Sequence, residues 1–325
     1  MDAWFELKER CARRESQALG GLSPNAYHEL EQAINNNPTD YVKTNDEKAL
    51  LILARALDRV MQERKNDDML DDAAFEQEHE RRMKRLAGAC EQALELDKDC
   101  LDARTVRAIA RHASRPDDLL SALLRLEDEY KPLSTSGVDP AKRRAESRLM
   151  DAAARSCLDT GRIQMTITRC QTLIEHNSTD EIGAHLTLSL AYARMENEDA
   201  LDALDAQFKR EGNTWMNLSR TLLLYKLNRL NAARRALSEF DRSCEGAAYA
   251  LLRPTFVDCY LPDRPRFKAK SFQEALLAMH EADPAVSDTP DFVGWATEQP
   301  SILTSAQQFA HKNGLGLISD LSRTH

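Results

Sequence analysis

One pattern of helical spacing recurs along this chain of 325 residues. The pattern is a stripe of three residues, the second and third lying four and seven positions after the first, so that all three share one face of a helix. Seven stripes fit the sequence. The regular copies begin at Leu86 and Leu120, 34 residues apart, and at Thr166, Ala200 and Ala233, with steps of 34 and 33. A period of this length predicts a chain built from repeated units of two helices.

Turn and cap residues support units made of antiparallel helix pairs. A second segment with helical character precedes each stripe and is joined to it by a short turn. Gly161 and Asn228 stand in two of these turns, at a position where a helix end favours a left-handed residue. Ser23, which precedes a proline, predicts a helix start. Pro38 and Pro284 each lie five positions beyond a stripe and predict helix ends.

Composition favours helix over sheet throughout the chain. Valine and isoleucine together number 16, whereas alanine, leucine, arginine and glutamate are abundant. Hydrophobic residues make up 42% of the chain and charged residues 30%, the balance of a globular protein. We therefore expect an all-α protein.

Charge and cysteine usage narrow the expected partners. A formal net charge of -9 disfavours non-specific binding to nucleic acid or to anionic lipid. No apolar run is long enough to span a membrane, and the amino terminus does not resemble a signal peptide. The seven cysteines are scattered, which suits a reducing compartment, and Cys90, Cys157 and Cys170 are expected to be small core residues. We expect a cytoplasmic protein that binds neither nucleic acid nor membrane.

The pattern resembles the tetratricopeptide repeat (TPR), with the best local matches in segments 149–180, 184–208 and 215–240. Thr166 departs from the family's small alanine, and Asn228 departs from its turn glycine. The resemblance implies an α-α superhelix of about six or seven antiparallel helix pairs in one domain spanning residues 1–325. The predicted insertions lie near 65–75, 132–142 and 261–270, and the predicted C-terminal capping segment is 289–325.

In TPR proteins the first helix of each pair lines a concave groove. Carried over by position, the resemblance implies that this groove is lined by Arg148, Asp151, Arg155, His185, Ser189, Tyr192, Trp215, Leu218, Leu222 and Tyr225. Each of these residues has the alternative role of packing against the next helix. No carboxylate partner for His185 is evident in the sequence.

The expected function is a non-catalytic protein-interaction scaffold that binds a peptide or helix of an unidentified partner protein. Trp215, Tyr225 and Tyr192 are the expected apolar anchors, and Arg148, Arg155 and His185 in that same set would meet polar or carboxylate groups. No cofactor and no metal are expected. A homodimer formed through either end of the chain is an open alternative, as is a structural homo-oligomer without a client.

One motif points to a different class of function. Asp67, Asp68 and Asp71 match the DDxxD motif with which all-helical isoprenoid synthases hold magnesium against a diphosphate. A second motif of that kind begins at Asp117, but Arg125 stands where its last glutamate ligand belongs. A solvated acidic segment is the competing interpretation, and we expect no enzyme. The cations of the segment 261–270, which include Arg264, are likewise expected to be solvated, with docking of an acidic tail or a phosphate as the alternative.

Overall fold

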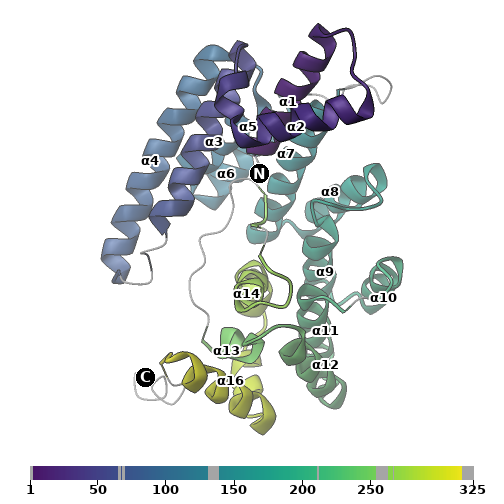
Figure 1. The fold of residues 1–325 in the computed structure, drawn as a ribbon. Helices are drawn as coiled ribbons and strands as arrows, with labels where there is room; N and C mark the ends of the chain where they lie inside the picture. Colours follow the sequence, from purple (N-terminus) through teal and green to yellow (C-terminus); the bar gives the residue numbers. More distant parts are fainter. Residues whose placement is uncertain are drawn as a thin grey trace. The chain divides into compact units, whose positions relative to one another are not determined.

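The computed structural model describes most of the chain. The described residues are 3–64, 67, 70–130, 139–210, 212–253, 263–265 and 267–316. Parts of the three predicted insertions and the last residues of the predicted capping segment lie outside them. Among these residues the structure contains α-helices and one 3-10 helix but no strand, so the prediction of an all-α protein is confirmed (Figure 1). Within the same ranges, no helix combines the length and the apolar character that crossing a membrane requires.

The chain divides into two compact units. Unit 1 contains the described residues up to Ala153 together with Asp263, and unit 2 contains those from Ala154 to Arg253 and from Arg264 onward. The helices of unit 1 are α1 (Ala3–Ala18), α2 (Pro24–Asn36), η1 (Pro38–Tyr41), α3 (Asn45–Glu63), α4 (Asp72–Leu96), α5 (Leu101–His112) and α6 (Pro116–Glu129). Helix α7 (Pro140–Asp159) contributes residues to both units.

The remaining helices belong to unit 2. They are α8 (Ile163–His176), α9 (Ala184–Arg194), α10 (Glu198–Gln207), α11 (Thr214–Lys226), α12 (Leu230–Ser243), α13 (Ala247–Leu252), α14 (Phe272–Ser287), α15 (Phe292–Thr297) and α16 (Pro300–Asn313). Each of the seven stripes identified in the sequence lies on one helix, successively α2, α4, α6, α8, α10, α12 and α14.

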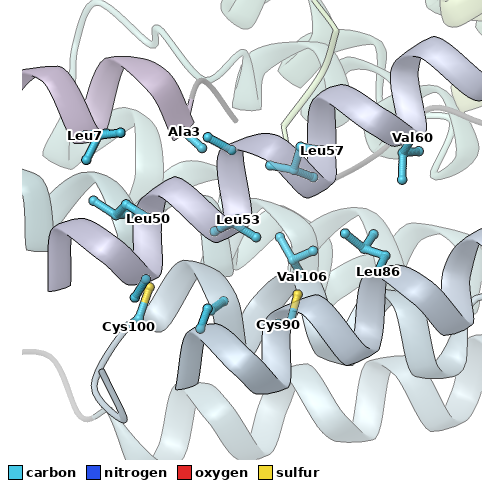
Figure 2. Close-up of a cluster of buried hydrophobic side chains, with 14 of the residues drawn as sticks. Ala3, Leu7, Leu50, Leu53, Leu57, Val60, Leu86, Cys90, Cys100 and Val106 are labelled. Atoms are coloured by element: carbon cyan, nitrogen blue, oxygen red, sulfur yellow. The ribbon is translucent and has the colours of Figure 1, made fainter. Parts of the chain in front are cut away.

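The core of unit 1 forms where the apolar faces of α1, α3, α4 and α5 meet. Leu7, Leu50, Leu53, Leu86 and Cys90 are almost completely buried there (Figure 2). Consecutive helices of this unit contact one another from α3 to α6, and α1 packs on α2 and α3. Burial of such side chains is the main stabilising contribution of each helix pair.

A buried ion-pair network adds charge to unit 1. The Arg148 guanidinium donates from Nε and Nη2 to the two carboxylate oxygens of Asp102, at 2.8 Å each, and from Nη1 to Glu6 at 3.0 Å. Arg144 donates to the same Glu6 at 2.8 and 2.7 Å. Burial by itself would raise the pKa of Glu6, but the Arg144 hydrogen bonds and the Arg148 charge outweigh it and lower that pKa. The network ties α1 to α5 and α7.

Consecutive helices of unit 2 also contact one another along the chain. Helix α9 contacts α8, α10 and α11, and α11 contacts α12. Gly161 and Asn228 adopt the expected left-handed conformation, with φ of 74° and 56°, and Ser23 of unit 1 caps α2 as predicted. The helix end predicted at Pro284 is wrong. The proline lies inside α14, which continues to Ser287: Pro284 lacks an N–H to donate, but its carbonyl still accepts a hydrogen bond from the Asp288 N–H at 3.2 Å.

The described cysteines are expected to be unreactive in the folded protein. Six of them are buried free thiols, and burial raises the pKa of Cys90 and of Cys100 to about 12. The nucleophilic thiolate is therefore scarce at neutral pH. We expect iodoacetamide at pH 7.5 to label these six cysteines only after the protein is unfolded in urea. Peptide mapping identifies the labelled residues. Labelling of Cys90 or Cys100 in the native state would contradict the burial.

Candidate functional site

The residues predicted to line a groove are distributed over both units. Arg148 and Asp151 belong to unit 1, and the other eight belong to unit 2. Arg148 is buried in the ion-pair network, Asp151 is fully buried, and Arg155 is buried in unit 2. The side chains of this first group are thus enclosed by the protein and present little surface to a ligand.

The apolar members of the predicted groove in unit 2 are also mostly buried. Trp215, Leu218 and Leu222 on α11 are at most 5% exposed, and Tyr192 on α9 is 8% exposed. The hydroxyl of Tyr192 accepts a hydrogen bond from Gln171 Nε2 at 3.0 Å. Ser189 is fully buried and its hydroxyl donates to the carbonyl of Leu186 at 2.7 Å. The packing role, which the sequence left open for each residue, accounts for these contacts.

A helix of the same chain lies against the α9 and α11 surface that carries these residues. Helix α14 contacts both α9 and α11, and Figure 1 shows it beside them. The indole of Trp215 donates from Nε1 to Glu281 of α14 at 2.7 Å. Glu281 is itself only 7% exposed, so a charged side chain lies within this contact. Part of the predicted peptide-binding surface is therefore covered by α14.

Arg264 joins the same contact and corrects the expectation that it is solvated. Its Nε donates to Glu281 at 2.9 Å, and its Nη1 donates to the carbonyls of Ile182 and Gly183 at 2.9 and 2.8 Å. Gly183 is left-handed, with φ of 78°, and a Cβ there would lie 3.1 Å from Nη1 of Arg264. Lys268 and Lys270 of the same segment are exposed, as expected, and Arg266 lies outside the described residues.

His185 has a carboxylate partner that the sequence analysis missed. Its Nδ1 lies 2.6 Å from Asp180 Oδ2, and its ring stacks on Phe208 with centroids 4.2 Å apart. Asn213 Nδ2 lies 3.4 Å from the other ring nitrogen, Nε2. His185 is thus held in place at the start of α9.

Tyr225, another of the predicted groove residues, borders an open pocket. An open pocket of about 430 Å³ lies in unit 2 where the carboxyl ends of α9, α11 and α14 come together. Its lining residues are Glu196, Tyr225, Lys226, Asn228, Leu230, Asp288, Thr289, Pro290 and Trp295. Trp295 was not among the predicted site residues. Its ring centroid lies 5.0 Å from that of Tyr225, and its indole Nε1 is buried without a hydrogen-bond partner.

Charged groups of both signs surround this pocket. Lys226 donates to the carbonyl of Arg194 at 2.8 Å and pairs with Glu196 at 3.3 Å, and Arg194 pairs with Asp288. Glu196 and Asp288 are about half exposed, so their charges remain partly solvated. The pocket therefore offers an aromatic wall with polar groups at its rim, a combination that suits a peptide segment.

The acidic motif of the alternative function has structural roles in unit 1. Arg82, which is 1% exposed, donates to both carboxylate oxygens of Asp67 at 2.8 and 2.9 Å. Asp71 caps α4 by accepting from the backbone of Ala74 at 2.8 Å, and Asp68 lies outside the described residues. In the part of the chain that the structure describes, no cluster of three or more histidine, cysteine or acidic residues is arranged to hold a metal.

No protein-family model, no curated protein and no solved structure matches the chain.

Proposed function

We propose that the protein is a non-catalytic interaction scaffold, with a TPR-like stack of helix pairs in unit 2, that binds a helix or peptide of a partner protein. The surface formed by α9 and α11 receives the partner. The partner first contacts the open pocket beside Tyr225, because the other predicted apolar anchors, Trp215 and Tyr192, are buried. No cofactor takes part in this function.

The observation that carries the proposal is the position of Tyr225. It is one of ten residues predicted to face a partner, and it lines an open pocket together with Trp295 and Pro290. Aromatic side chains at such pockets contribute a large share of binding energy in protein interfaces. Helix α14 adds support, because α9 and α11 already bind this helix on the same surface.

Blocking the pocket should abolish partner capture. Pro290 is exposed at the pocket, so Pro290→Arg places a long charged side chain in the opening while leaving the aromatic residues in place. Tyr225→Ala removes the aromatic wall itself. We expect both variants to lose, by tenfold or more in quantitative mass spectrometry, proteins that the intact chain captures from a native lysate, corresponding to a loss of about 1.4 kcal/mol or more of binding free energy.

A matched control separates the pocket from general surface effects. Met61 of unit 1 is an exposed apolar side chain at 49%, and Met61→Arg should leave capture unchanged. Circular dichroism of each variant establishes that the helices are intact. Equal capture by all four chains would refute the proposal. A purified chain that sediments as a dimer, and that Pro290→Arg dissociates, would identify a second copy as the partner.

A further inference from the structure

We infer that α14 is an internal occupant of a helix-binding surface on α9 and α11, and that the partner helix which replaces it carries a carboxylate at the position of Glu281. The inference rests on the proposed function and specifies both the chemistry of the partner and the way binding is restrained. Helix α14 and the partner helix compete for the same hydrogen-bond donors on this surface.

The first argument is the chemistry of the buried contact. Burying a carboxylate is costly unless hydrogen-bond donors and a counter-charge replace water. The surface provides both, because Trp215 Nε1 and Arg264 Nε donate to Glu281 at 2.7 and 2.9 Å. A helix with an apolar residue at this position would lose the hydrogen bonds that Trp215 and Arg264 donate to the carboxylate of Glu281. The surface therefore selects an anionic side chain.

The second argument is that Arg264 is fixed by groups outside α14. Its Nη1 is bound to the carbonyls of Ile182 and Gly183, and its Nη2 is bound to the hydroxyl of Thr187 at 2.5 Å. These acceptors belong to α9 and to the turn that precedes it. The guanidinium can therefore stay in place when α14 leaves, and it then offers Nε to an incoming carboxylate.

The third argument is the way in which α14 is held. Its buried apolar residues are Leu277, Met279 and four alanines at helical spacing, Ala275, Ala278, Ala282 and Ala285. An alanine buries much less apolar area than a leucine, so the free energy that each such contact contributes is small. The ion pair between Asp288 and Arg194 at the end of the helix is partly solvated. An advantage of α14 over a partner helix that makes the same contacts is its attachment to the chain, which acts as an effective concentration in about the millimolar range.

A labelled peptide tests the exchange directly. The probe is a fluorescein-labelled peptide with the sequence of residues 271–288, and the receptor is the full chain carrying Glu281→Gln. The substitution keeps the shape of the internal helix but removes its charge, so the internal occupant competes less well. We expect fluorescence anisotropy to show at least about tenfold tighter binding to Glu281→Gln than to the unsubstituted chain, because hydrogen bonds to charged groups are the stronger ones.

Two controls make the result specific to the carboxylate. A peptide with Glu281→Gln should bind the same receptor about tenfold more weakly than the glutamate peptide. Adding Trp215→Phe to the receptor removes the indole donor and should reduce the difference between the two peptides. If Trp215→Phe fails to fold, the comparison of the two peptides on the Glu281→Gln chain decides the question alone.

Equal binding of both peptides, or no binding to a folded Glu281→Gln chain, would overturn the inference. Dimerisation of the Glu281→Gln chain in sedimentation velocity would also overturn it, because it would assign the surface to α14 of a second copy. These outcomes are distinct from failure of the proposed function. If the Glu281→Gln chain does not bind the peptide but Pro290→Arg still abolishes partner capture, the proposed scaffold function at the pocket remains supported.

Discussion

Replacing Arg148 by alanine is expected to lower the free energy of unfolding of unit 1 by about 3–5 kcal/mol. The reason is that the buried carboxylate of Asp102 remains after the guanidinium is removed. Arg148 supplies two hydrogen bonds to Asp102 and one to Glu6, and all three residues are buried. Without the guanidinium, Asp102 loses the counter-charge that offsets its desolvation. Urea denaturation followed by circular dichroism measures the loss, and hydrogen exchange should locate it in α1, α5 and α7.

The matched control is an arginine on the same helix that is exposed. Arg143→Ala should change the free energy of unfolding by no more than about 0.5 kcal/mol, as surface substitutions usually do. Replacing the three buried charges together, with Arg148→Met, Glu6→Leu and Asp102→Leu, should recover much of the lost stability, because none of these three charges is then left buried without its partner, and the half-exposed Arg144 still pairs with Glu9. Equal effects of Arg148→Ala and Arg143→Ala would show that the network contributes nothing.

Acidification gives an independent check of the same network. The pKa of Glu6 is lowered below its ordinary value of 4.5, so its ion pairs contribute fully above about pH 4.5. Their contribution is lost as the pH falls through the lowered pKa, when Glu6 takes up a proton. The stability difference between the original chain and Arg148→Ala should therefore narrow below pH 4.5. A difference that stays constant down to pH 3 would contradict the assignment.

Local patterns in the sequence predict the helices of this protein well. The stripe of α12, formed by Ala233, Leu237 and Phe240, is almost completely buried, as its spacing predicts. Gly161 and Asn228 mark turns because a left-handed residue at a helix end is a property of a few neighbouring residues. Such signals depend on contacts within one or two helical turns, and a single sequence contains them.

The role of α14 could not be predicted in the same way. Its stripe, which begins at Phe272, correctly predicts a helix, but Phe272 and Leu276 are only partly buried. Met279, the third residue of the stripe, is buried, but the other buried apolar residues are Leu277 and four alanines off the stripe, and Glu281 is bonded to Trp215, 66 residues away. No local pattern specifies such a pairing. The groove positions assigned by resemblance therefore include side chains that the chain's own helix covers.

Arg264 and Asp67 show the same limit for charged residues. Each lies in a polar segment whose composition suggested exposure to solvent. Each instead pairs with a residue of opposite charge that is buried, Glu281 for Arg264 and Arg82 for Asp67. A charge in a loop finds its partner through tertiary structure, and the spacing of charges along the sequence does not reveal it.

Replacing Gly246 by alanine is expected to destabilise unit 2 by about 2–4 kcal/mol, the sum of a backbone and a steric effect. The residue is left-handed, with φ of 73°, which disfavours any side chain by about 1 kcal/mol. In addition, a Cβ at this position would lie 2.6 Å from the ring of Phe309, and overpacking of this kind costs about 1–3 kcal/mol. Phe309 cannot move freely, because its ring contacts those of Tyr249 and Phe272.

Gly161 provides a control that isolates the steric part of this effect. Its φ of 74° is nearly the same, but a Cβ added there would meet no atom within 4 Å, so Gly161→Ala should cost only about 1 kcal/mol. The two variants therefore share the backbone strain and differ in the contact with Phe309. Thermal unfolding of both chains measures the difference directly. If Phe309→Leu is added, the larger cost of Gly246→Ala should fall toward that of Gly161→Ala, because the smaller side chain makes room for the new methyl group. If both glycine variants lose the same stability, the aromatic cluster of Tyr249, Phe272 and Phe309 rearranges around the new methyl group at no measurable energetic cost.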